Sequence, residues 1–215
     1  GWSAVKLYFM LGLPTETDED VLGIADLAKK VLQLWRETAP DKRRGCRITV
    51  STACFVPKPH TAFQWEPQVT REEYLRRVKL LRDNMREKSI VYHWHDPDTS
   101  FLEAVFARGD HRLADAIELA WREGAKFDAW SEYFDLDRWL RAFDACGLDP
   151  AFYANRTRDR EEVLPWSRIS TGVTPAFLWR EREWAYEAVI TPDCRKQCTG
   201  CGANHLLEKG RACDE

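Results

Sequence analysis

The sequence predicts an α/β fold over residues 1–95, followed by a region built from helices alone. Apolar runs at residues 4–11 and 47–55 are continuous, as in strands that are buried in a parallel sheet. A well-capped amphipathic segment, residues 18–37, lies between these two runs. From residue 96 onward the apolar residues follow a helical period. We therefore expect adjacent parallel strands that are joined by helical crossovers of right-handed sense.

Composition narrows the class of protein further. The chain has 215 residues, of which 44% are hydrophobic, and a formal net charge of −3. A charge this small exerts no general attraction on nucleic acids or membranes, and no apolar run reaches the ~20 residues that a transmembrane helix needs. The seven cysteines show no pattern of pairs, and four of them stand in the last 22 residues. This distribution predicts a cytoplasmic protein with a local metal site and no membrane partner.

The early elements each have a local signal. Gly12 ends the first strand, and Thr17 is the expected N-cap of the first helix, with three acidic residues in the first turn. After the second strand, Pro57 and Pro59 break the chain into a loop. A second helix is expected from Thr70 to about residue 88, followed by a short strand at 89–94.

The later elements are predicted to be helical. Ser100 and Glu103 have capping-box spacing, and two amphipathic segments end at Gly124 and Gly147. A last helix is expected over residues 175–189. We expect three parts: 1–95 with the strands, 96–190 as a helical extension, and 191–215 as a cysteine-rich tail.

Two stretches carry a resemblance to a known family. "YFMLGLPTETDEDV" and, about 40 residues later, "VSTACFVPKPHTAFQW" resemble the fifth and sixth strands of the barrel in radical S-adenosylmethionine (SAM) enzymes. The likeness is to the branch with an N-terminal cobalamin-binding domain and to the methylthiotransferases. "HDPDTSFLEAVFARGDHRL" and the terminal cysteines also resemble an uncharacterised family of this branch.

The resemblance implies the second half of a partial (β/α)6 barrel that binds SAM and a [4Fe–4S] cluster, with cobalamin as an associated cofactor. By similarity, the backbone at Met10, Leu11 and Gly12 and at Phe55 and Val56 would contact the adenine of SAM. The cluster-binding cysteines of that family follow the first barrel strand, ahead of everything in this chain. We therefore expect the N-terminal half of the barrel to be a missing partner and this fragment to be inactive by itself.

The tail cysteines have C-x3-C-x2-C spacing, which is also the spacing of the cysteines that bind the [4Fe–4S] cluster in radical SAM enzymes. Here, however, they follow the barrel strands. Cys194, Cys198 and Cys201 therefore predict a second metal site, with Cys213 as the expected fourth ligand and His205 as the next candidate. Clustered thiolates bind Zn²⁺ or an iron–sulfur cluster, and the sequence leaves both open.

Histidines provide the remaining candidates. His60 lies in the loop that carries the resemblance, so a role in positioning substrate is one hypothesis for it. His93 and His95 are two residues apart, which on a strand places both on one face. Contact with substrate is the corresponding hypothesis for His93, and hydrogen-bonded rim residues are the alternative.

Two function classes remain at this point. The first is a portion of a radical SAM enzyme whose substrate is unknown, with RNA or a ribosomal component among the candidates. The second is a non-catalytic RNA- or protein-binding module in which the tail is a zinc knuckle and exposed aromatic side chains stack on the partner. Exposure of the ten tryptophans separates them, since buried tryptophans would weaken the second class.

Overall fold

The computed structural model describes residues 2–43 and 45–206. The chain divides into two compact units. The first unit comprises residues 1–56 and 68–102, and the second comprises residues 57–67 and 103–215. The loop at 57–67 thus groups with the helical part of the chain and not with the unit that contains β2 and α2, its neighbours in sequence.

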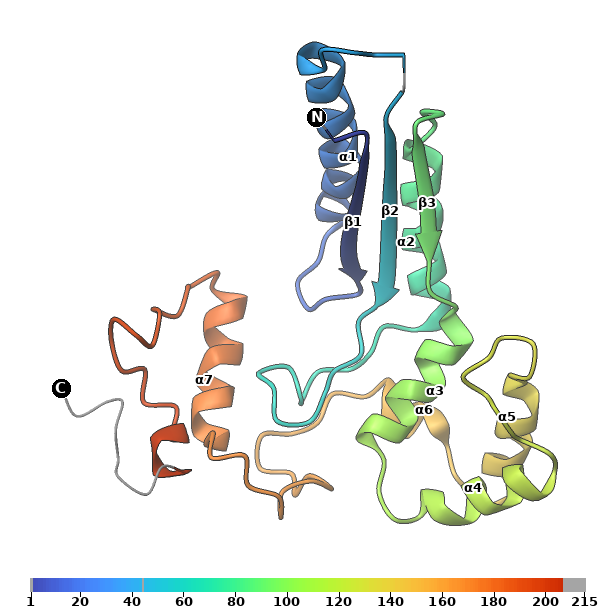
Figure 1. Cartoon of the computed structure of the whole chain (residues 1–215). Helices are drawn as coiled ribbons and strands as arrows, with labels where there is room; N and C mark the ends of the chain where they lie inside the picture. The colour runs from blue at the N-terminus through green and yellow to red at the C-terminus, as the bar shows by residue number, and fades with distance from the viewer. Residues whose placement is uncertain (1, 44, 207–215) are drawn as a thin grey trace. The chain divides into compact units, whose positions relative to one another are not determined.

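The first unit is a three-stranded parallel sheet with order β1-β2-β3 (Figure 1). Its strands are β1 (Ala4–Leu11), β2 (Arg47–Cys54) and β3 (Ile90–Trp94). Ala4 pairs with Arg47 and Leu11 with Cys54 in parallel register, as the two apolar runs predicted. Helices α1 (Asp18–Thr38) and α2 (Arg71–Asn84) are the crossovers, and Figure 1 shows both on the same face of the sheet.

The core of this unit lies between the sheet and the two helices. Alternate strand residues point into it, and the helices contribute one apolar stripe each. Buried members of this core are Leu11, Val21, Ile24, Ala25, Ala28, Leu32, Ile48, Val50, Tyr74, Val78, Leu81, Met85 and Ile90.

The helix caps agree with the local predictions at Thr17, in part at Thr70, and not at Ser100. Thr17 forms a capping box with Asp20, as its position before three acidic residues indicated. Thr70 accepts from the Glu73 N–H, but the Glu73 carboxylate pairs with arginines, so this box is only half formed. Helix α3 (Pro97–Arg108) begins before Ser100, because Asp96 caps it by accepting from the Thr99 N–H at 2.8 Å. The predicted start at Ser100 was therefore wrong.

All regular secondary structure in the described part of the second unit is helical, and no strand occurs between residues 103 and 206. After the end of α3 it contains α4 (Leu113–Arg122), α5 (Leu136–Ala145), α6 (Pro150–Ala154), α7 (Pro175–Tyr186) and the short 3-10 helix η1 (Ala203–Leu206). Long loops join these short helices, so side chains must satisfy many backbone carbonyls.

Arg108 is the main example of such a side chain. It is fully buried and donates to the carbonyls of Tyr153 at 3.0 Å, Gln64 at 3.1 Å and Arg156 at 3.3 Å. Arg158 in turn donates to the Arg108 carbonyl. Burial, together with the neighbouring charges of Arg158 and Arg156, lowers the pKa of Arg108 to about 10. These bonds join three segments that are distant in sequence.

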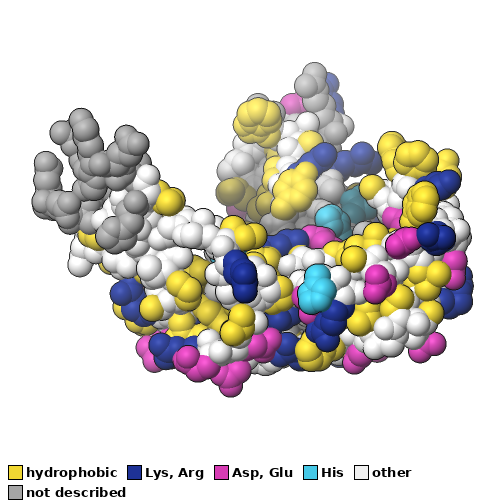
Figure 2. Space-filling view, turned by 90° about the horizontal axis from the view of Figure 1, so that it is seen from below, with side chains coloured by type: hydrophobic (Ala, Val, Ile, Leu, Met, Phe, Trp, Pro, Cys, Tyr) yellow, Lys and Arg dark blue, Asp and Glu magenta, His cyan; other side chains and the backbone are white. Residues whose placement is uncertain are grey.

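The surface is of mixed charge. On the face shown in Figure 2, Lys and Arg are interspersed with Asp and Glu and do not gather by sign. No helix within the described ranges is both long and apolar enough to cross a membrane.

Candidate functional site

The carboxyl ends of β1 and β2 bring together the residues that the sequence singled out for SAM. Leu11 pairs with Cys54, and the Phe55 N–H donates to the Leu11 carbonyl at 2.8 Å. Met10, Gly12 and Val56 are their direct neighbours in sequence, so the five predicted positions lie at one edge of the sheet. In an open parallel sheet, ligands bind at this edge.

Gly12 is held in a conformation that side chains rarely adopt. Its φ is +91°, and a Cβ placed there would lie 2.6 Å from Cγ2 of Val69. The Gly12 N–H donates to Oε2 of Glu16 at 2.7 Å, which closes the turn between β1 and α1. Glycine is therefore required here both by the backbone angle and by the close approach of Val69.

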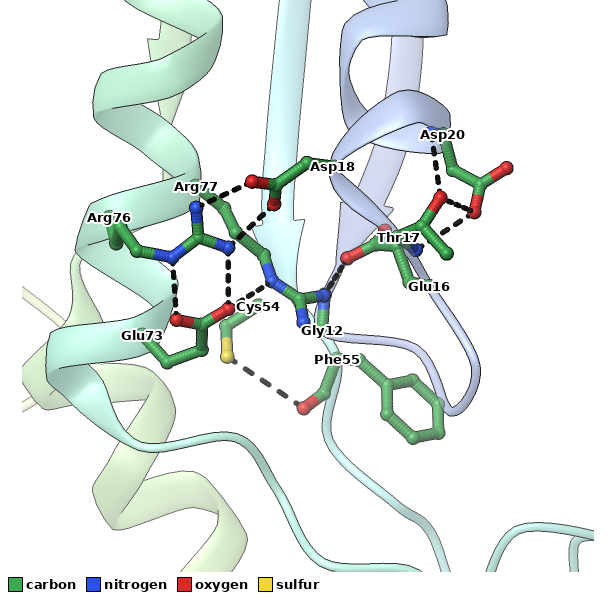
Figure 3. A network of polar contacts seen from close by, with 10 residues as sticks. All are labelled: Gly12, Glu16, Thr17, Asp18, Asp20, Cys54, Phe55, Glu73, Arg76 and Arg77. Carbon is green, nitrogen blue, oxygen red and sulfur yellow. Dashed lines mark hydrogen bonds and ion pairs between the residues drawn. The ribbon is translucent and has the colours of Figure 1, made fainter.

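An ion-pair network is joined to this turn through Glu16 (Figure 3). Glu16 pairs with Arg77, and their side chains are only 7% and 12% exposed. Arg77 also binds Glu73 at 2.7 Å, and Arg76 joins Glu73 to Asp18. The network thus connects the Gly12 turn and the start of α1 to the first turns of α2.

Glu73 carries the clearest electrostatic effect of this network. Its hydrogen bond from Arg76, and then the one from Arg77, lower the pKa of the Glu73 carboxyl to about 2. None of these roles was predicted from the sequence. Arg77 lies four residues after Glu73, a spacing that signals a helical ion pair, but its partner Glu16 is 61 residues away.

The sheet face opposite the helices is exposed and carries further side chains near the strand ends. Tyr8 is 71% exposed and Met10 is 49% exposed on this face. Tyr8, Ser51 and His93 are aligned across the three strands by the parallel register. His93 and His95 are both exposed, but Trp94 between them is exposed as well and β3 ends at Trp94, so their placement on one strand face stays a prediction.

This open face also has a hollow of about 310 Å³. Its lining includes Tyr8, Met10, Ser51, Ala53 and His95. The hollow combines an aromatic ring, a thioether, a hydroxyl and an imidazole.

Aromatic hydroxyls are buried on the helix side of the sheet. Tyr74 donates to the His95 carbonyl at 3.2 Å, and Tyr92 shares a hydrogen bond of 2.8 Å with Thr52. Burial raises the pKa of Tyr92 to about 12 and raises that of Tyr74 as well. Both phenols are therefore neutral, and Tyr74 anchors the end of β3 where His95 lies.

His60 belongs to the second unit, apart from these strand ends in the division of the chain. Its φ is +57°, and its N–H donates to Oε1 of Gln64 at 3.0 Å. This strained turn positions the histidine at a pocket that is described below.

The tail cysteines lie in turns that suit metal ligands. The Gly200 N–H donates to Sγ of Cys198, and the Ala203 N–H donates to Sγ of Cys201, each at 3.4 Å. Gly200 and Gly202 both have positive φ, as expected for a tight turn around ligands. At Cys201, which carries a free thiol, a backbone N–H that points at sulfur favours the thiolate form, which is the form that binds a metal.

Other observations on the tail leave its metal site a prediction. Cys198 is disulfide-bonded, whereas Cys194 and Cys201 carry free thiols. No three His, Cys, Asp or Glu side chains in the described part of the chain are grouped closely enough to hold a metal ion. Cys213 and the side chain of His205 lie outside the described residues.

Comparisons with known proteins give one informative match. Over 148 residues the chain is 28% identical to Uncharacterized protein MJ0966 of Methanocaldococcus jannaschii. The match covers 69% of this chain but only 31% of that protein's length. No family model and no solved structure matches the chain. The chain is therefore similar to one part of a longer archaeal protein to which the comparison attaches no activity.

Proposed function

We propose that this chain is the C-terminal portion of a radical SAM enzyme, with part of a (β/α)6 barrel in residues 1–95. The observation that carries the proposal is the bare face of its parallel sheet. Parallel sheets are normally covered on both faces, yet the described residues of this unit cover only one. A barrel resolves this, because the uncovered face becomes its interior.

The outer edge of the sheet supports the same proposal. Among the described residues β1 pairs only with β2, so its other edge is open. Beside it is an apolar hollow of about 460 Å³ whose lining includes Trp2, Val31 and Leu34. Trp2 is 86% exposed and Leu34 is 59% exposed. An open strand edge next to an apolar helix flank fits a preceding strand and helix, which would be the nearest unit of the missing part of the barrel.

SAM bound to a reduced [4Fe–4S] cluster supplies a 5′-deoxyadenosyl radical in such enzymes. In this chain the backbone at Met10, Leu11 and Gly12 and at Phe55 and Val56 would contact the adenine of SAM. The Glu16 carboxylate holds the Gly12 turn in place, so the site is rigid before the ligand arrives. The ligands of that cluster belong to the missing half, as does the cobalamin that the resemblance implies.

The tail supplies a second, separate metal site in this proposal. Cys194, Cys198 and Cys201 provide three thiolates once the disulfide at Cys198 is reduced, and Cys213 is the proposed fourth ligand. The hydrogen bond to Sγ of Cys201, which carries a free thiol, supports a thiolate role for that residue. Zn²⁺ would hold the tail as a closed structural site, and an iron–sulfur cluster would make it an auxiliary redox centre.

The decisive experiment for the enzyme uses a longer protein that contains this chain together with a complete barrel. Under anaerobic conditions with dithionite, it should convert SAM to 5′-deoxyadenosine, measured by mass spectrometry. This chain alone should bind SAM weakly or not at all in calorimetry. A longer protein that neither binds a [4Fe–4S] cluster nor cleaves SAM would refute the proposal, as would micromolar affinity of this chain for SAM.

The tail is tested on this chain itself. Anaerobic reconstitution after reduction, followed by elemental analysis and absorbance, should give one zinc or one iron–sulfur centre per chain. Replacing Cys194, Cys198 and Cys201 together by serine should abolish this content, whereas Cys146→Ser, at the C-cap of α5, should leave it unchanged. Full metal content in the triple variant would exclude the site.

Exposed aromatic side chains favour the second candidate, a binding module. Only three of the ten tryptophans are buried, and four are exposed. Trp121, Phe127, Trp130 and Tyr133 are exposed together in and after α4, among mainly acidic neighbours. Acidic surroundings repel a nucleic-acid backbone, so this surface favours a polypeptide partner over RNA. Binding of single-stranded RNA that weakens in Trp121→Ala would reverse this order.

A further inference from the structure

The second unit contains a pocket that the SAM proposal does not use. Its volume is about 370 Å³, within the range of small-molecule sites. The 57–67 loop, the segment 160–173 and the start of α7 line it, and all of them belong to this unit. Its apolar wall includes Leu164, Trp166, Val173 and Leu178. We call this cavity the Trp65 pocket, after the buried tryptophan in its lining.

Gln64 presents a donor to this pocket. Its side chain is almost completely buried, and its Oε1 accepts from the His60 N–H at 3.0 Å and from Nε1 of Trp166 at 2.6 Å. These two donors fix which end of the amide is oxygen. The amide NH2 then has no acceptor among the residues that the structure describes, which leaves two N–H donors for a ligand.

Trp65 adds a second donor of unusual character. The residue is 2% exposed, and its Nε1 is buried without a hydrogen-bond partner in the described part of the chain. The Trp179 ring, with its centroid 5.0 Å away, is a weak acceptor at best. Buried polar atoms are seldom left unsatisfied, so this N–H is suited to an acceptor that enters the pocket, whether a water or a ligand atom.

The charges that line the pocket favour an anion. Glu162 is already neutralised by Arg156 at 2.6 Å and Arg158 at 3.3 Å. Among the described residues Arg160 forms an ion pair with the solvent-exposed Glu161 at 3.7 Å, a contact of little strength, and its guanidinium carbon lies 5.4 Å from the centroid of the Trp179 ring. Among the described residues of the lining, Arg160 is therefore an available cation beside several N–H donors, and the one carboxylate, Glu162, is already paired.

We propose that the Trp65 pocket binds a small carboxylic acid with a compact aromatic or branched apolar body. The carboxylate is the acceptor for the Gln64 amide, the Trp65 indole N–H and the Arg160 guanidinium. The apolar body packs against Leu164 and Trp166. This site goes beyond the proposed enzyme function, because it needs neither SAM nor a metal cluster and lies wholly within one unit.

The test uses phenylacetate as the probe and phenylacetamide as its uncharged match, each titrated into the whole chain. Calorimetry should show saturable binding of phenylacetate, about tenfold tighter than phenylacetamide, since charge-assisted hydrogen bonds are roughly twice as strong as neutral ones. In ¹H–¹⁵N spectra the Trp65 indole signal, assigned with Trp65→Phe, should move downfield on binding.

Two pairs of variants decide the matter. Arg160→Gln should lower phenylacetate affinity about tenfold and leave phenylacetamide binding unchanged, whereas Arg168→Gln, outside the pocket, should change neither. Val173→Phe should fill the cavity and abolish both, with Val189→Phe as the control and thermal unfolding as the check of folding. No saturable binding to the unmodified chain, equal affinity for the two probes, or unchanged phenylacetate binding in Arg160→Gln would each overturn the proposal.

Discussion

Replacing Glu16 by glutamine tests whether the network behind the Gly12 turn stabilises the first unit. Glutamine keeps the shape and an oxygen for the Gly12 N–H, which now donates at 2.7 Å. The change removes the charge that faces Arg77, in a pair whose side chains are 7% and 12% exposed. Breaking a buried ion pair costs about 3–5 kcal/mol, because the remaining charge is left uncompensated.

The expected cost lies below that range for a reason visible in Figure 3. Arg77 keeps its bond to Glu73 at 2.7 Å, so its charge stays partly compensated. We expect Glu16→Gln to lower the free energy of unfolding by about 2–3 kcal/mol. Glu16→Ala should cost about 1 kcal/mol more, because the Gly12 N–H also loses its acceptor.

Urea denaturation followed by circular dichroism measures this difference. The matched control is Glu161→Gln, whose side chain is 87% exposed and pairs with Arg160 only at 3.7 Å. That control should change the free energy of unfolding by less than about 0.5 kcal/mol. Equal stability of Glu16→Gln and Glu161→Gln would refute the reasoning that the buried network holds the turn.

Three further predictions follow from single positions. Arg108→Met should lower the free energy of unfolding by about 3–5 kcal/mol, because three carbonyls lose a buried donor. The control Arg112→Met, at an exposed ion pair, should lower it by less than about 1 kcal/mol. Thermal unfolding of the two variants measures the difference. Gly12→Ala should cost about 2 kcal/mol in urea denaturation, from its φ of +91° and the clash with Val69, and unchanged stability would contradict this strain. Glu73 has a folded-state pKa of about 2 against an ordinary value of 4.5. The stabilisation that its ionised form gives the folded chain is therefore fully present above pH 4.5 and is lost as the pH falls toward 2. Glu73→Gln should flatten that part of the curve of unfolding free energy against pH.

Local sequence patterns determined the first unit almost completely. Continuous apolar runs marked β1 and β2 as parallel strands, and Thr17 with its acidic followers marked the start of α1. Each of these signals depends on residues within one turn or one strand, where side-chain period and backbone hydrogen bonding act over a few positions. The helical nature of the later region could be predicted for the same reason.

Only the tertiary structure decided which distant groups meet. Glu16 pairs with Arg77 across 61 residues, and Arg108 binds carbonyls of Gln64, Tyr153 and Arg156 that no periodicity marks. The Trp65 pocket likewise depends on loop 57–67 joining the helical unit. Such contacts arise because buried polar groups must find partners wherever the fold brings them, and sequence distance plays no part in that choice.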